Sequence, residues 1–120
     1  MKATYETGIS GEDAAAGYLC SLGMTLLEKR FKVRCGEIDL ILRDHDTVVF
    51  VEVKTRLTGP VGSGLIAVTG AKQRRIANAA SLYLKIRGMT GCYVRFDVVE
   101  VNREGLIHIP NAFQPGGMIC

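Results

Sequence analysis

Apolar and polar residues alternate along five short stretches of the chain, and in two longer stretches the apolar residues recur every three or four positions. Alternation predicts β-strands, and the longer spacing predicts amphipathic helices. We expect strands over 24–34, 37–43, 48–54, 92–101 and 106–109, with one helix before them and another near 71–86. This order predicts an α/β fold with a central mixed sheet of about five strands flanked by helices.

Capping signals set the expected ends of the two helices. Ser10 is a suitable N-cap for the first helix, and Gly23 is expected just past its C-terminal end. Thr69 is the expected N-cap of the second helix, and Gly88 lies past its C-terminal end. The stripes expected to be buried are Ala15, Tyr18, Leu19 and Leu22 in the first helix, and Ile76, Ala79, Ala80, Tyr83 and Leu84 in the second.

Charged residues interrupt the two apolar strands at 37–43 and 48–54. Because side chains alternate between the faces of a strand, Asp39 shares a face with Ile41, whereas Ile38 is expected on the opposite face with Leu40 and Leu42. In the second strand, Glu52 and Lys54 share a face. The two carboxylates therefore come together only in certain registers.

One register would place Asp39 opposite Glu52. Arg43 would then lie opposite Val48, with a four-residue loop of residues 44–47 between the strands. Directly opposed residues have Cβ atoms about 4.5–5.5 Å apart, so two carboxylates there could bind one cation. A slip of one residue would place the carboxylates on opposite faces.

Composition changes this picture little. The chain has 120 residues and a formal net charge of +3, which predicts a single domain over 1–120 with loosely ordered tails at 1–7 and 114–120, and which permits an anionic partner. The longest apolar run within the strands is Val48 to Val51, so no membrane association is expected and the chain is predicted to be cytoplasmic. Its four cysteines form no C-x-x-C pair, which disfavours a zinc site.

A basic cluster follows a glycine-rich loop at 57–70. Lys72, Arg74 and Arg75 fall in the first turn of the second helix, where backbone N–H groups and the helix dipole favour a phosphate. A solvated basic face is an equally good interpretation of this cluster.

Asp39, Glu52 and Lys54 are the residue types that a metal-dependent phosphodiesterase needs. Two carboxylates bind a hard cation such as Mg²⁺, which stabilises charge on the phosphate. A lysine two positions after the second carboxylate projects to the same side, where it can orient water or stabilise the phosphate.

Several motifs together resemble the YraN-type family of uncharacterised bacterial proteins. They are Gly8-x-x-Gly11-Glu12, Gly36-Glu37-Ile38-Asp39-Leu40-Ile41, Val49 to Arg56, Ala67-Val68-Thr69 before Lys72 to Arg75, and Arg95 to Val99. That family is similar to the restriction-endonuclease-like nucleases, which include archaeal Holliday-junction resolvases.

The resemblance implies a restriction-endonuclease-like core and a set of site residues. Asp39 and Glu52 would be metal ligands with the Val53 backbone carbonyl as a third, Lys54 the catalytic lysine, and Glu12 an acidic residue that reaches the metal from the first helix. On helix statistics alone, Glu12 is a first-turn acidic residue favoured by the helix dipole.

Two functions from different classes follow. The leading one is a Mg²⁺- or Mn²⁺-dependent endonuclease that hydrolyses phosphodiesters in DNA, in preference to RNA, including branched or single-stranded structures, and that pairs as a homodimer as related nucleases do. Its phosphate contacts would come from Arg56, Lys72, Arg74 and Arg75. The alternative is a non-catalytic module that keeps the nuclease fold and binds nucleic acid or a partner. Three acids, Glu37, Asp39 and Glu52, against the single base Lys54 favour the metal-binding interpretation.

Overall fold

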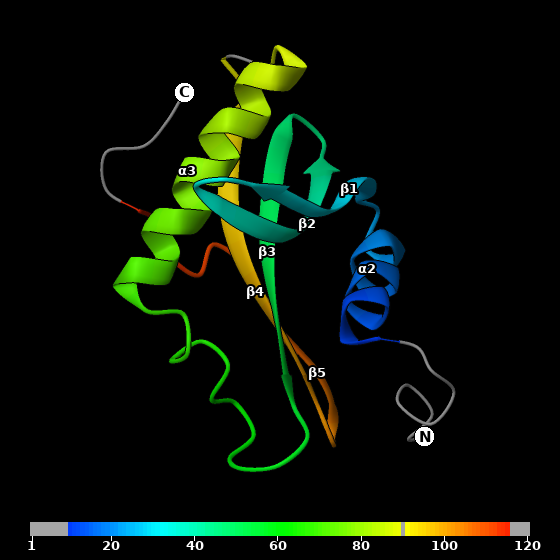
Figure 1. The fold of residues 1–120 in the computed structure, drawn as a ribbon. Coiled ribbons are helices and arrows are strands. Elements are labelled where there is room, and N and C mark those ends of the chain that lie inside the picture. Colours follow the sequence, from blue (N-terminus) through cyan, green and yellow to red (C-terminus); the bar gives the residue numbers. More distant parts are fainter. Residues whose placement is uncertain (1–9, 90, 116–120) are drawn as a thin grey trace.

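The computed structural model describes residues 10–89 and 91–115. Within them lie two helices and five strands, in the predicted order. The helices are α2 (Gly11–Ser21) and α3 (Gly70–Arg87), and the strands are β1 (Thr25–Val33), β2 (Gly36–Asp44), β3 (Thr47–Arg56), β4 (Tyr93–Asn102) and β5 (Gly105–Ile109). The predicted α/β class is confirmed (Figure 1).

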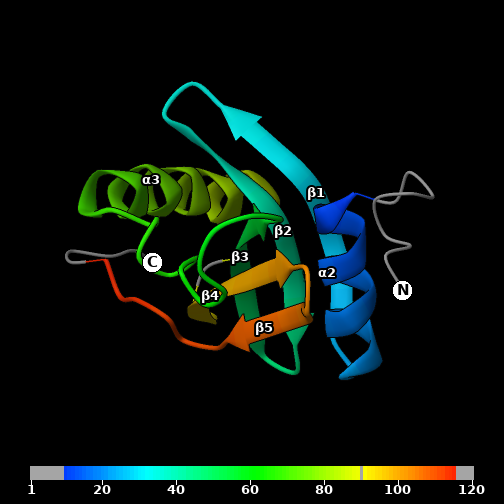
Figure 2. The same ribbon diagram turned by 90° about the horizontal axis from the view of Figure 1, so that it is seen from below.

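The five strands form one sheet in the order β1-β2-β3-β4-β5. Neighbouring strands are antiparallel except for β3 and β4, which are parallel and are connected through α3. The helices α2 and α3 lie on opposite sides of the sheet (Figure 2). This arrangement is consistent with a restriction-endonuclease-like core, with β3 at its centre.

Each helix covers its own hydrophobic cluster. On the α3 side, Ile76, Ala80 and Tyr83 pack against Phe50 and Phe96. On the α2 side, the buried residues of the cluster are Ala15, Ala16, Leu19, Met24, Leu40, Leu42, Val49, Val51, Val99 and Val101. Because β3 contributes to both clusters, its apolar residues are buried on both faces, as expected for a central strand.

The predicted helix caps are present. Ser10 Oγ accepts a hydrogen bond from Asp13 N at 3.1 Å, and Thr69 Oγ1 accepts one from Lys72 N at 3.2 Å. Gly88 ends α3 in the left-handed conformation, with φ of 66°. The predicted stripe of α3 is buried, but Leu22, expected in the stripe of α2, is 53% exposed. It is the C-cap residue, so it lies past the last turn that faces the sheet.

The first strand, β1, lies at the edge of the sheet and contains an irregularity. The register of β1 against β2 shifts between Leu26 and Glu28, which marks a β-bulge. The β1–β2 hairpin curls past the rest of the sheet toward α3 (Figure 2).

The turn between β2 and β3 is tighter than the predicted four-residue loop. Asp44 pairs with Thr47, so only His45 and Asp46 connect the strands. His45 has a φ of 58°, which a two-residue hairpin turn requires. The shorter turn leaves the predicted register unchanged.

No helix within residues 10–89 and 91–115 is long and apolar enough to cross a membrane. Of the tails expected at 1–7 and 114–120, residues 1–7 and 116–120 lie outside the described residues. Gln114 and Pro115, which were assigned to the second tail, line a pocket beside β4.

Candidate functional site

The candidate site lies where β2 separates from β3. The ladder between these strands runs from the Asp44–Thr47 pair to the Leu40–Val51 pair and includes Arg43 opposite Val48, which is the register that an Asp39–Glu52 pairing demands. The backbone pairing of β2 with β3 ends at Leu40, and the next contact between the strands is made by the side chain of Asp39. Its Oδ2 accepts a hydrogen bond from Val53 N at 2.8 Å.

The separation also changes which face the next residue occupies. Ile38 was expected beside Leu40 and Leu42, but it packs in the α3 cluster with Ile41. Simple alternation therefore fails on either side of Asp39, because β2 leaves β3 here and continues with β1. Gly36, at the start of β2, lies directly beneath the Arg75 carbonyl of α3, where an added Cβ would clash with backbone.

Asp39 is a carboxylate in an unfavourable environment. Burial and the nearby charge of Glu52 raise its pKa from 3.8 to about 7, and the charges of Glu12 and Glu37 act in the same direction, against the hydrogen bond from Val53 N. The negative charges of Glu52, Glu12 and Glu37 therefore all act on Asp39.

Glu52 is only 4% exposed and contacts two lysines. Its Oε2 lies 3.0 Å from Lys54 Nζ and 3.2 Å from Lys72 Nζ. Lys54 comes from the same face of β3, as predicted. Lys72 comes from the first turn of α3, so the helix that covers this face of the sheet also supplies a cation to the site.

Glu12 lies in the first turn of α2 and is bound to a residue that sequence reasoning missed. Its Oε1 accepts a hydrogen bond from Arg30 Nε of β1 at 2.7 Å. Gly11 beside it lies against the Thr55 side chain, so the N-terminus of α2 faces the end of β3, just past Lys54. No sequence pattern singles out Arg30, because it lies in an edge strand that is polar at most positions.

Glu100 anchors the glycine-rich loop between β3 and α3. Glu100 lies opposite Lys54 in the β3–β4 ladder and is 1% exposed. Its carboxylate accepts hydrogen bonds from Gly62 N and Gly64 N, and from Asn102 Nδ2. Burial raises the pKa of Glu100, but these hydrogen bonds outweigh it and hold the pKa below its ordinary value. An acidic residue inside the apolar strand β4 was the available signal.

The loop contacts the lysine as well. A Cβ on Gly64 would lie 3.3 Å from the Lys54 Cβ. The loop therefore packs at Gly64 against the aliphatic part of the Lys54 side chain, and Glu100 holds the loop in this position.

The predicted phosphate-binding residues divide into two groups. Lys72 is partly buried and paired with Glu52, whereas Arg74 and Arg75 are exposed on α3. Arg56, at the end of β3, donates from Nη1 to the Thr55 carbonyl at 3.3 Å. The structure thus brings Lys72 into the acidic cluster and leaves two arginines facing solvent nearby.

The donor set suits a hard cation. Asp39 and Glu52 offer carboxylate oxygens, and Val53 N donates a hydrogen bond to the Asp39 carboxylate. Among the described residues no group of three or more His, Cys, Asp or Glu side chains is arranged to hold a metal. Mg²⁺ is commonly bound through one or two carboxylates, with water and substrate phosphate completing its shell. Burial and then the negative charge of Glu52 raise the pKa of Asp39, and a bound cation would offset that charge.

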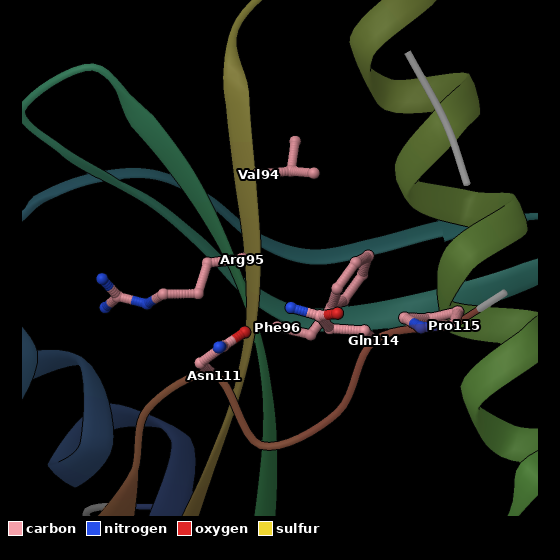
Figure 3. Close-up of a pocket in the computed structure, with 6 residues that line it drawn as sticks. All are labelled: Val94, Arg95, Phe96, Asn111, Gln114 and Pro115. Carbon is pink, nitrogen blue, oxygen red and sulfur yellow. The ribbon is translucent and has the colours of Figure 1, made fainter. Parts of the chain in front are cut away.

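A second buried acidic group lies elsewhere on the sheet. Asp97 of β4 accepts hydrogen bonds from Arg95 and from Asn111 N, and His108 Nε2 lies 2.8 Å from its Oδ2. A pocket beside the strand is lined by Val94, Arg95, Phe96, Asn111, Gln114 and Pro115, and the Arg95 side chain extends away from Phe96, Gln114 and Pro115 (Figure 3). This pocket contains none of the predicted site residues.

Known proteins similar to this chain give the family but no activity. Residues 11–101 match the model of a family described as uncharacterised protein family UPF0102. A UPF0102 protein of Geobacter sulfurreducens is 43% identical over 89% of this chain and 88% of its own length. One from Chlorobium chlorochromatii is 50% identical over 82% of this chain and 76% of its own length. The family match extends over α2, β1 to β3, α3 and β4 up to residue 101, and so includes all four predicted catalytic residues.

Proposed function

The chain belongs to uncharacterised protein family UPF0102, and from the geometry of its site we propose that it is a Mg²⁺- or Mn²⁺-dependent endonuclease that hydrolyses phosphodiester bonds in DNA. The observation that carries the proposal is the geometry at the point where β2 separates from β3. There the Asp39 carboxylate accepts a hydrogen bond from Val53 N, and Glu52 and Lys54 project from the same face of β3. The strands have the register that a shared cation requires.

The metal would be held by Asp39 and Glu52, with the Val53 carbonyl and Glu12 as further oxygen donors. When bound, such a cation neutralises phosphate charge and stabilises the attacking and leaving oxygens. The other tasks belong to the chain. Lys54, 3.0 Å from Glu52, is placed to orient the attacking water and to stabilise negative charge on the pentavalent phosphate. Lys72 offsets the charge of Glu52 from α3.

Arg74 and Arg75 supply exposed positive charge beside this site, and Arg56 lies at the end of the strand that carries Lys54. Contacts of this kind bind phosphates irrespective of sequence and depend strongly on salt. The proposal therefore favours recognition of DNA by shape, including branched or single-stranded forms.

The alternative is a non-catalytic module that binds nucleic acid or a partner. Lys72 joins Lys54 on Glu52, so the count of three acids against one base drawn from the sequence was wrong. With Lys72 and Arg30 included, the site is closer to neutral, which favours this alternative. The raised pKa of Asp39 favours the nuclease, because an inert ion-pair network should satisfy its carboxylates.

The test is cleavage of labelled duplex, single-stranded and four-way-junction DNA, with RNA for comparison, in Mg²⁺, Mn²⁺ or chelator. Asp39→Asn, Glu52→Gln and Lys54→Ala should each lose activity by at least roughly 10²–10³-fold, the effect of removing one group that stabilises charge in a transition state. Asp46→Asn, in the exposed hairpin turn, is the matched control and should cleave normally.

Cleavage that survives all three site variants would rule out this site. Binding of DNA without cleavage in any metal would support the module instead.

A further inference from the structure

Arg30 has a backbone conformation that its position in the chain does not explain. Its φ is 52°, in the left-handed region that side chains with a Cβ rarely adopt. Two other described non-glycine residues share this feature. His45 lies in the two-residue hairpin turn, and Asn111 is a residue type that tolerates the region. Arg30 instead lies inside strand β1, so its conformation carries a strain that must be compensated.

The strain occurs directly across from the candidate site. Lys29 pairs with Leu40 and Phe31 pairs with Ile38, so Arg30 and Asp39 hold corresponding positions between these two pairs. From there its Nε donates to Glu12 Oε1 at 2.7 Å. The guanidinium is thus held beside two of the four predicted catalytic residues.

Attachment of α2 to β1 does not account for this arrangement. Lys29, the preceding residue, forms an equivalent ion pair between the same two elements, with its Nζ 2.6 Å from Asp13 Oδ1. The Arg30 side chain is 65% exposed, and ion pairs between exposed groups contribute little to stability. The ion pair of Arg30 contributes too little stability to explain why its backbone is strained. The strain therefore indicates a role other than folding.

The guanidinium retains free capacity for an anion. Within the described residues its hydrogen bond is made through Nε, and an arginine has four further N–H groups on its two terminal nitrogens. Such a planar pair of donors matches phosphate oxygens. On the other side of the site, Lys54 and Lys72 are both engaged by Glu52.

We propose that Arg30 is a phosphate-binding residue of this protein, which contacts a backbone phosphate of the nucleic acid on the α2 side of the site while holding Glu12 toward Asp39. The inference rests on the proposed nuclease function and adds a substrate contact to it. In the free protein the same guanidinium neutralises Glu12.

The test measures DNA affinity in chelator across a range of salt concentrations. Arg30→Asn removes the charge and keeps a residue suited to the left-handed backbone, so this variant should fold at least as well as the wild type. Its affinity should fall roughly tenfold, and the slope of log affinity against log salt should decrease by about 0.7–0.9. Arg30→Lys should recover part of both. The matched control Lys29→Ala should leave the slope unchanged.

The outcomes separate the two proposals. If the wild type cleaves DNA and Arg30→Asn binds with unchanged affinity and slope, the phosphate contact is wrong and the nuclease stands. An equal loss in Lys29→Ala would also overturn the contact, because it would show a general effect of charge. If the wild type neither binds nor cleaves any nucleic acid, the nuclease proposal itself fails.

Discussion

Asp97 and Asp39 are both acidic residues within strands of one sheet, but their carboxylates differ in how many hydrogen bonds they accept. The Asp97 side chain is fully buried and accepts hydrogen bonds from Arg95 Nε at 2.9 Å, Arg95 Nη2 at 3.0 Å and Asn111 N at 2.9 Å, with His108 Nε2 at 2.8 Å. The hydrogen bond of Asp39 within the described residues comes from Val53 N alone.

The difference distinguishes a carboxylate that holds the fold together from one that is available to a ligand. Asp97 joins β4, β5 and the segment after β5, and the hydrogen bond to Asp97 is the main cause that raises the pKa of Arg95. Asp39 has acidic neighbours, and its own pKa is raised to about 7. Burial alone therefore does not mark a functional acid. Asp39 forms no ion pair within the described residues, and this contrast with Asp97 supports the proposal that Asp39 binds a ligand.

The largest expected effect follows from exchanging each acid for its amide. Asp97→Asn should destabilise the fold by about 3–5 kcal/mol, because it removes the charge of a fully buried carboxylate that accepts hydrogen bonds from Arg95 and Asn111 N. Asp39→Asn should leave stability at pH 7 unchanged or slightly raised, since it removes a carboxylate whose charged form is disfavoured. Urea denaturation of both variants measures the difference. A loss of stability in Asp39→Asn that equals the loss in Asp97→Asn would show that Asp39 is structural.

Glu100 provides an intermediate case, because its partners belong to the loop beside Lys54. Glu100→Gln should cost about 1.5–3 kcal/mol at pH 7, the contribution of hydrogen bonds to a charged group. The folded-state pKa of Glu100 lies below its unfolded value of 4.5, so its stabilisation is complete above that pH and is lost as the pH falls through the folded-state pKa. The gap between wild type and variant should therefore narrow below pH 4.5.

Denaturation of both proteins at several pH values measures this gap. Glu28→Gln, in an exposed ion pair with Arg87, is the control and should cost at most about 1 kcal/mol. A gap that stays constant with pH would mean that the charge of Glu100 does not anchor the loop.

Local patterns were sufficient to predict the elements and part of the site. The caps Ser10 and Thr69 and the register that faces Asp39 toward Glu52 all depend on residues close together in the sequence or on the period of a strand. The faces of β2 were only partly predictable, because Ile38 follows the curl of the hairpin.

The contacts that sequence reasoning missed join elements far apart in the chain. Arg30 meets Glu12 and Lys72 meets Glu52 only after the two helices have packed on opposite faces of the sheet. No spacing rule encodes such contacts. Lys72 illustrates the consequence, because its place in a basic helix turn predicted a phosphate contact, while the fold directs it onto a carboxylate.

The smallest expected effect is the response of stability to a cation, and it sharpens the contrast between the two aspartates. A ligand that binds the folded state alone stabilises it by RT ln(1 + [L]/Kd), which is about 1.4 kcal/mol at ten times Kd. Mg²⁺ or Mn²⁺ should therefore raise the Tm of the wild type, and Asp39→Asn or Glu52→Gln should abolish that rise. Glu100→Gln keeps both carboxylates and should retain it. A thermal melt with increasing Mg²⁺ needs no nucleic acid, so it tests the metal site independently of cleavage. If Asp39→Asn responds to Mg²⁺ as the wild type does, the cation binds elsewhere, and the single hydrogen bond of Asp39 would no longer mark it as a metal ligand.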